Sequence, residues 1–230
     1  MSSLYVVATP IGNLEDFSFR ALRILSEVDL ILCEDTRVTK KLLDRYGIKT
    51  PTLSYHQHSK LQKIDYIINL LKQDKNIALV SDAGTPGISD PGGKLVEEAV
   101  ESLNDSVKVV PIPGPSAVAT AASISGFPVD KFLFLGFPPA KKKRKKFFEE
   151  ILNSSYPVVF YESPYRILKT LNELKENFQV SGFGFQVMVC RELTKKFETI
   201  YRGNIEKVIE SVKNNMIKGE FVIIINRDGK

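Results

Sequence analysis

Short runs of apolar, often β-branched residues recur along the first half of the chain and alternate with longer amphipathic segments. The runs Leu4–Ala8, Val28–Cys33, Ile77–Ser81 and Val107–Ile112 predict strands that are apolar on both faces. Between them, apolar residues at spacings of three and four predict helices over residues 14–28, begun by Asn13 as N-cap, 64–71 and 95–103. Buried strands alternating with helices are typical of a mainly parallel sheet covered on both faces, so residues 1–113 are expected to form an α/β domain.

The second half follows a different pattern. It begins after Pro111-Ile112-Pro113-Gly114-Pro115, which is too rich in proline to continue a helix or strand. A helix of small residues is predicted over 116–125, with strands over 132–137, 158–161, 186–190, 198–202 and 221–226. The short connection from Cys190 to Glu198 suits a hairpin, so residues 114–230 are expected to form a second α/β domain with a mixed sheet.

The composition of the chain excludes some classes of protein. The 230 residues carry 32 Lys and Arg against 27 Asp and Glu, and 43% are hydrophobic, which is ordinary for a globular protein and excludes a disordered tail. The N-terminus lacks a basic leader and no apolar run approaches the ~20 residues of a membrane span, so a cytoplasmic protein without membrane contact is expected. Cys33 and Cys190 lie in apolar strands, which predicts buried, reduced thiols.

The excess positive charge of the chain lies in one segment. Lys141-Lys142-Lys143-Arg144-Lys145-Lys146 carries more positive charge than the net +5 of the whole protein. The run could be a solvated charged face. Because six like charges beside a helix N-terminus oppose the helix dipole, we favour a polyanion partner, namely the phosphate backbone of a nucleic acid. A membrane surface is the weaker alternative, since no lipid-facing apolar stripe adjoins the run.

The segment Ser81–Gly93 follows a predicted strand and leads into a helix. Its four glycines permit close approach of a ligand to the backbone, and loops past the carboxyl ends of parallel strands commonly bind ligands. A turn-rich connection capped by Ser89 and Asp90 is the alternative, although a plain connection needs fewer residues. Neither a Gly-x-Gly-x-x-Gly nor a P-loop motif occurs in the chain, which disfavours a standard dinucleotide or nucleoside triphosphate site.

Two further loops follow strands of the first half, Thr9–Asn13 and Glu34–Arg37, and all three loops should converge on one rim of the sheet. Glu34 and Asp35 could instead mark a solvated helix N-terminus, where carboxylates favour the dipole. Both interpretations stay open, although Arg37 suits a helix N-terminus poorly.

Polar residues also follow strands of the second half, in Tyr161-Glu162-Ser163-Pro164 and Cys190-Arg191-Glu192-Leu193-Thr194. Ser163 before Pro164 suits the start of a helix better than a nucleophile. His56 and His58 have no partners at metal-ligand spacing, so a metal site and a hydrolytic triad are both disfavoured.

Together these segments resemble the tetrapyrrole-methylase-like, class III S-adenosylmethionine methyltransferases, and within them the subgroup that methylates the ribose 2′-hydroxyl of a cytidine in 16S ribosomal RNA. The matching segments cover residues 4–14, 33–37, 81–92, 111–117, 125–127, 160–164 and 190–194. The wider class usually has a glycine-rich first loop and a Gly-Asp-Pro in the second, whereas this chain has Ala8-Thr9-Pro10-Ile11-Gly12 and Gly84-Thr85-Pro86. Both departures are those of the ribosomal subgroup and argue against a tetrapyrrole substrate.

The resemblance implies a homodimer that binds S-adenosylmethionine in a cleft between its two domains and acts on 16S rRNA or the small ribosomal subunit. By motif position, the resemblance assigns the following cofactor contacts: Ile11, Ala83, Gly84, Thr85, Ile88, Ser116, Ala117, Glu162 and Leu193. The lysines and arginine of 141–146 would then bind the RNA.

The sulfonium methyl group is already an activated electrophile, so such an enzyme mainly aligns a ribose hydroxyl with it and accepts the proton. The candidate proton acceptors are Glu34, Asp35, Asp82, Glu162 and Glu192, and Arg37 and Arg191 could hold the target phosphate. No metal is required by this chemistry. Two rival hypotheses remain, a small-molecule methylase of the same fold and a non-catalytic RNA-binding module.

Overall fold

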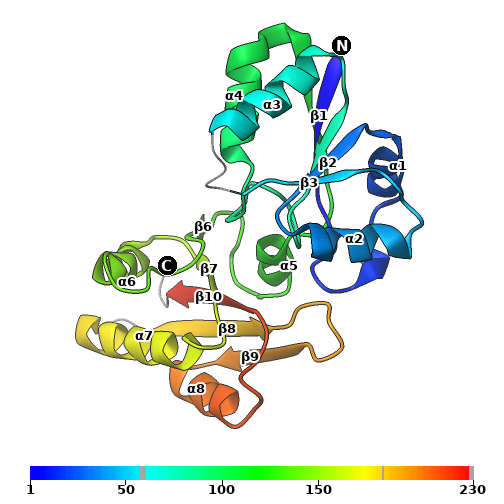
Figure 1. Ribbon diagram of the computed structural model, residues 1–230. Helices are drawn as coiled ribbons and strands as arrows, with labels where there is room; N and C mark the ends of the chain where they lie inside the picture. Colours follow the sequence, from blue (N-terminus) through cyan, green and yellow to red (C-terminus); the bar gives the residue numbers. More distant parts are fainter. Residues whose placement is uncertain (57–60, 183, 228–230) are drawn as a thin grey trace. The chain divides into compact units, whose positions relative to one another are not determined.

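The computed structural model describes residues 1–56, 61–182 and 184–227, and the chain groups into two compact units, Met1–Ser116 and Ala117–Lys230 (Figure 1). The sequence placed its domain boundary a few residues earlier, at 113. Each unit is built around its own five-stranded sheet. His58, one of the two histidines considered above, lies outside the described residues.

The sheet of the first unit is entirely parallel, with the order β3-β2-β4-β1-β5. Its strands are β1 (Ser2–Val7), β2 (Leu30–Cys33), β3 (Thr52–Ser54), β4 (Ile77–Leu79) and β5 (Val107–Ile112). The mainly parallel sheet expected from the apolar runs is confirmed. Pro111 fits within β5 because β5 is an edge strand, where a residue without an N–H interrupts no ladder.

Helices cover both faces of this sheet. Those of the first unit are η1 (Leu14–Asp16, a 3₁₀ turn), α1 (Phe19–Glu27), α2 (Thr36–Arg45), α3 (Leu61–Lys72), α4 (Gly93–Leu103) and η2 (Asn104–Ser106, a 3₁₀ turn). Buried side chains of α3 and α4 pack with those of one sheet face, and buried side chains of α1 and α2 pack with those of the other. Because both faces are covered, the central strands β2 and β4 are apolar throughout and β1 is apolar after its first two serines.

Two details of the first unit differ from the sequence prediction. The helix expected over 14–28 is two elements, because the Asn13 side chain caps only the 3₁₀ turn and Ser18 caps α1 separately by accepting from the Ala21 N–H. The short edge strand β3 was not predicted, since three residues carry no readable alternation.

The sheet of the second unit is mixed, in the order β6-β7-β10-β8-β9, and only β6 and β7 run parallel. Its strands are β6 (Leu133–Phe134), β7 (Val158–Glu162), β8 (Phe185–Arg191), β9 (Thr199–Gly203) and β10 (Phe221–Arg227). The predicted antiparallel hairpin is β8–β9, which confirms the mixed sheet. The helices of this unit are α5 (Ala117–Ser123), α6 (Arg144–Asn153), α7 (Ile167–Ser181) and α8 (Ile205–Lys213).

The largest core cluster of the second unit lies between its sheet and three helices. Aromatic and aliphatic residues of α6, α7 and α8 pack against inward residues of β7, β8, β9 and β10. The short helix α5 contacts β7 and β10. One prediction here is wrong: Pro164 does not start a helix, because residues 164–166 form a turn and α7 begins at Ile167. No helix in the described part of the chain is both long and apolar enough to cross a membrane.

Candidate active site

The three loops that follow β1, β2 and β4 are joined to one another in the first unit. The loop after β1 pairs with the glycine loop, because Thr9 N–H donates to the Gly84 carbonyl at 2.9 Å and Gly84 N–H donates to the Thr9 carbonyl at 3.0 Å. The loop after β2 reaches the same segment, where Asp35 N–H donates to Asp82 Oδ1 at 3.0 Å. The strand order β2-β4-β1 places these loops side by side, so the expected convergence on one rim is what the structure has.

The glycine loop is also tied to the segment after β5. The Thr85 hydroxyl donates to the Pro115 carbonyl at 3.1 Å, and a Cβ on Gly84 would lie 3.3 Å from Ile11 Cγ2 and 3.8 Å from that carbonyl. Gly84 has a φ of +81°, which side chains rarely adopt, so glycine is required here both by conformation and by close packing. The loop is a formed, internally braced structure. Ile88 in the same loop is exposed.

Glu34 is the carboxylate of this rim whose surroundings disfavour its charge. Partial burial raises the pKa of Glu34, and the nearby carboxylate of Asp82 raises it further, while the charge of His56 lowers it somewhat. A raised pKa brings a carboxylate closer to the range in which it accepts a proton effectively at neutral pH. The sequence named Glu34 as one candidate among five but gave no reason to prefer it.

Asp35 has a different role. Its carboxylate caps α2 by accepting from the Arg37 N–H at 2.8 Å and binds the Arg37 guanidinium at 2.6 Å. These bonds from Arg37 hold the pKa of Asp35 well below its usual range. A carboxylate this acidic is a poor proton acceptor, so the helix N-terminus interpretation explains Asp35. Arg37 keeps an exposed guanidinium on the rim.

The strand-end residues of the second unit are occupied by internal contacts. Glu162 is 1% exposed. It accepts from the Ser163 N–H at 2.7 Å, from the Thr170 hydroxyl at 2.6 Å and from Arg166 Nη2 at 2.8 Å. Because both carboxylate oxygens are engaged within this unit, the structure does not support Glu162 as a proton acceptor or cofactor contact.

Arg191 and Glu192 are likewise engaged in hydrogen bonds within the second unit. Arg191 is buried and donates to the Lys218 carbonyl at 2.7 Å and the Phe197 carbonyl at 3.2 Å. Burial raises the pKa of Glu192, but hydrogen bonds from Lys195 and from the Glu220 N–H outweigh it and the net shift is downward. The predicted phosphate ligand and proton acceptor therefore act as braces between β8 and the segment before β10.

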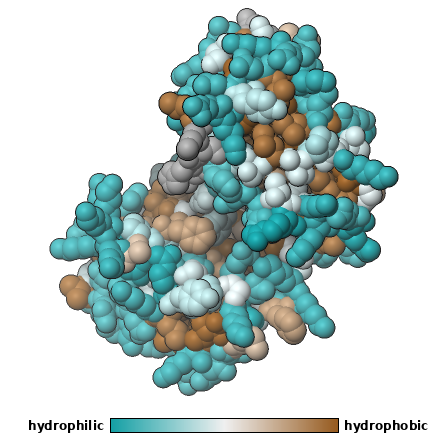
Figure 2. All heavy atoms as spheres, viewed as in Figure 1, coloured by the Kyte–Doolittle hydropathy of each residue, from teal (hydrophilic) through white to brown (hydrophobic). Residues whose placement is uncertain are grey.

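Arg144 is buried, although the sequence predicted it to be part of a basic surface that binds RNA. It is 7% exposed, and its guanidinium donates to Glu173 at 2.8 Å, the Thr170 hydroxyl at 2.7 Å and the Pro139 carbonyl at 3.1 Å. The run of six cations is therefore a group of five exposed lysines around one buried arginine, and Arg144 is unavailable to RNA. We call Lys141, Lys142, Lys143, Lys145 and Lys146 the lysine cluster. The surface over α6 is mostly hydrophilic (Figure 2).

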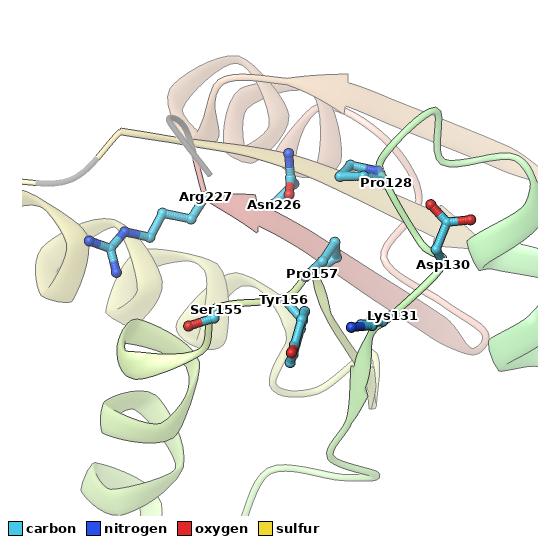
Figure 3. Close-up of a pocket in the computed structure, with 8 residues that line it drawn as sticks. All are labelled: Pro128, Asp130, Lys131, Ser155, Tyr156, Pro157, Asn226 and Arg227. Carbon is cyan, nitrogen blue, oxygen red and sulfur yellow. The ribbon is translucent and has the colours of Figure 1, made fainter.

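A cavity of about 330 Å³ lies elsewhere in the second unit (Figure 3). It is lined by Pro128, Asp130, Lys131, Ser155, Tyr156, Pro157, Asn226 and Arg227. Pro157 precedes β7 and Arg227 ends β10, so the cavity adjoins the end of these two strands that lies opposite to Glu162. None of the predicted site residues lines it.

The chain is similar over nearly its whole length to known proteins. A family model described as Tetrapyrrole (Corrin/Porphyrin) Methylases matches residues 3–209. The chain is 45% identical over 229 residues to the ribosomal RNA small subunit methyltransferase I of Halalkalibacterium halodurans, covering 99% of this chain and 77% of that protein. It is 42% identical over 226 residues to the protein of the same name from Thermotoga maritima, covering 98% and 99%.

The chain belongs to the tetrapyrrole methylase family. Within it, the chain groups with the ribosomal RNA small subunit methyltransferase I proteins, which is the resemblance that the motifs indicated. Like its family, it is a methyltransferase whose methyl donor is S-adenosylmethionine. A solved structure, the cobalt precorrin-4 methyltransferase CbiF, shares the fold with a TM-score of 0.68 at 16% identity, covering 97% of this chain and 94% of that one.

One observation in the first unit fits a bound cofactor of this type. The braced loop at Gly84–Ile88 offers backbone without Cβ atoms at Gly84 and Gly87, both with positive φ. The following residues all stay predictions as cofactor contacts: Ile11, Ala83, Gly84, Thr85, Ile88, Ser116, Ala117 and Leu193.

Proposed function

We propose that this protein transfers the methyl group of S-adenosylmethionine to the ribose 2′-hydroxyl of a cytidine in 16S rRNA. The observation that carries the proposal is the near full-length similarity to proteins named ribosomal RNA small subunit methyltransferase I, together with the braced glycine loop. The five exposed lysines support an RNA substrate over a tetrapyrrole, because a polyanion compensates their mutual repulsion. We also propose a cytoplasmic homodimer.

In the proposed reaction the bound cofactor supplies an electrophilic methyl group. Gly84, Thr85 and Ile88 of the glycine loop would hold it. The chain must then accept one proton from the ribose hydroxyl as the oxygen–carbon bond forms. Glu34 suits this role because burial and Asp82 raise its pKa, and Asp82 stays beside it through its bond to the Asp35 N–H. Arg37, exposed on the same rim, is the candidate contact for the neighbouring phosphate.

The test is methyl transfer in vitro. Purified protein is incubated with radiolabelled S-adenosylmethionine and small ribosomal subunits whose 16S rRNA lacks the modification. We expect label in 16S rRNA at a single cytidine whose 3′ phosphodiester resists alkaline hydrolysis, as ribose methylation requires. Label on a base, or transfer only to a tetrapyrrole, would refute the proposed substrate.

A further inference from the structure

An exposed aromatic side chain lies next to the lysine cluster in the second unit. Phe137 is 53% exposed and follows β6. Its ring packs against that of Tyr161 on β7 at 5.3 Å, and Tyr161 in turn packs against Phe134 at 5.0 Å. Phe137 is therefore half exposed and is supported by the ring of Tyr161, which is itself packed against Phe134. Phe137 differs from other exposed aromatic residues of the chain, such as Phe19, in being held by an aromatic neighbour and adjoining a run of cations in the sequence.

The backbone that carries Phe137 is fixed by two arginines. Arg166 Nη1 donates to the Pro138 carbonyl at 3.0 Å, and Arg144 Nη1 donates to the Pro139 carbonyl at 3.1 Å. Glu162 connects them, since it binds Arg166 directly and reaches Arg144 through the Thr170 hydroxyl. We call Glu162, Arg166, Thr170 and Arg144 the buried polar network. It ties β7, α6, α7 and the segment after Phe137 into one rigid support.

The same network fixes the lysine cluster relative to Phe137. Arg144 lies inside the run of lysines, and Lys141 follows Phe137 by only four residues, a span of at most about 14 Å. A rigid aromatic face beside flexible cations is the combination that binds single-stranded nucleic acid, in which a base stacks on the ring and the phosphates meet the lysines. Duplex RNA would engage the lysines through its phosphates but not the ring, because its bases are paired and stacked.

We propose that Phe137, supported by Tyr161, is a stacking platform for one unpaired base of the RNA, and that the lysine cluster neutralises the adjoining phosphates. This inference rests on the proposed function and adds to it the form of the RNA: a single-stranded segment with an accessible base. It also assigns a role to the buried polar network, which positions the ring of Phe137 by holding the Pro138 and Pro139 carbonyls.

The absence of tryptophan from the chain allows a direct test. Phe137→Trp places the only tryptophan of the protein on the platform, where stacking with a base should quench its fluorescence. Tyr156→Trp is the matched control, since Tyr156 is also a half-exposed aromatic residue of the second unit but precedes β7, at the opposite end of that strand from Tyr161. Both variants are titrated with a single-stranded RNA oligonucleotide and with an abasic ribose-phosphate oligomer of equal length, while anisotropy reports binding independently.

We expect quenching of the tryptophan at position 137 by the RNA but not by the abasic oligomer, and no comparable quenching at position 156. In addition, Phe137→Leu should lower affinity for single-stranded RNA about tenfold without changing its salt dependence. Unchanged fluorescence at position 137 under saturating RNA, or equal quenching at both positions, would overturn the platform. A response to anionic lipid vesicles alone would assign the surface to a membrane and overturn it as well.

Failure of this inference is distinguishable from failure of the proposed function. If the parent protein methylates 16S rRNA while the tryptophan at position 137 is not quenched, the platform is wrong and the function stands. If the parent protein transfers no methyl group to rRNA although the tryptophan is quenched, the platform stands as an RNA contact and the function is wrong. Thermal melting of each variant checks that the second unit remains folded.

Discussion

Polar residues follow buried strands in both units, yet the two units use them differently. In the first unit a backbone pair, Thr9–Gly84, connects the loops after β1 and β4, and the Asp82 carboxylate connects the loop after β2 to them. The Glu34 carboxylate and the exposed Arg37, which pairs with Asp35 of its own loop, take no part in these connections. In the second unit the side chains themselves connect the segments, so Glu162 and Arg191 are already engaged in hydrogen bonds within the unit. The first unit therefore leaves the Glu34 carboxylate available for chemistry, whereas the second unit engages the Glu162 carboxylate and the Arg191 guanidinium in its own structure.

The largest effect expected from this comparison is on stability. Glu162→Gln removes the charge opposite Arg166 and disturbs the bonds to Thr170 and the Ser163 N–H, all in a buried site. Loss of one partner of a buried ion pair typically costs about 3 kcal/mol of unfolding free energy. Urea denaturation measures it, with Glu176→Gln, an exposed position on the same helix as Thr170, as control. A Glu162→Gln protein as stable as the control would show that the network does not brace the unit.

The second prediction concerns turnover. Glu34→Gln removes the proposed proton acceptor and should lower kcat for methyl transfer about a hundredfold, with affinity for S-adenosylmethionine unchanged. Glu101→Gln, an exposed position on α4, is the control and should leave both quantities as in the parent. If Glu34→Gln retains full turnover, the proton leaves by another route and alignment alone accounts for the rate.

The third prediction distinguishes the general effect of backbone strain from a specific effect of Gly84 on cofactor binding. Gly84→Ala forces a side chain into a φ of +81° and against Ile11, and should weaken S-adenosylmethionine binding about tenfold besides costing about 1 kcal/mol of stability. Gly47→Ala carries a comparable conformational cost at a φ of +68°, with nothing within 4 Å of the new Cβ. Calorimetry should therefore show weaker cofactor binding only for Gly84→Ala. Equal affinities in the two variants would place the cofactor away from the glycine loop.

The smallest effect is expected from the lysine cluster. Replacing Lys142 and Lys145 with Gln should lower the slope of log affinity for RNA against log salt by about one unit per lost phosphate contact. Cofactor affinity should not change. The double variant Lys72→Gln with Lys94→Gln removes the same charge from exposed positions outside the cluster and serves as control. A slope equal to that of this control would identify the cluster as a solvated surface.

Much of the fold could be predicted from the sequence, because buried parallel strands leave continuous apolar runs. β5 was predicted at its observed bounds, and the hairpin of β8 and β9 followed from the short spacing between them. The exceptions are local. β3 is too short to show a pattern, and the break between η1 and α1 depends on Ser18 as a second cap inside one amphipathic stripe.

The site was predictable only in part. Family motifs and the glycine loop indicate the rim of the first unit, because strand ends and missing Cβ atoms are visible in a sequence. Whether a strand-end carboxylate is free or engaged depends on residues far along the chain. Glu162 is bonded by Thr170 and Glu192 by the Glu220 N–H, and no spacing predicts those partners. Arg144 shows the same limit, since nothing in a run of six cations marks the one that turns inward toward Glu173.

The pH dependence of methyl transfer tests the central claim most directly, namely that the proton acceptor lies on the first unit's rim. A base must be ionised to act, so the rate of the parent protein should rise with pH through the raised pKa of Glu34, at constant saturating cofactor and RNA. The account predicts that Glu34→Gln loses this rising limb, whereas Glu162→Gln, assayed where it remains folded, keeps it. A limb retained by Glu34→Gln and lost by Glu162→Gln would contradict the account and move the chemistry to the second unit.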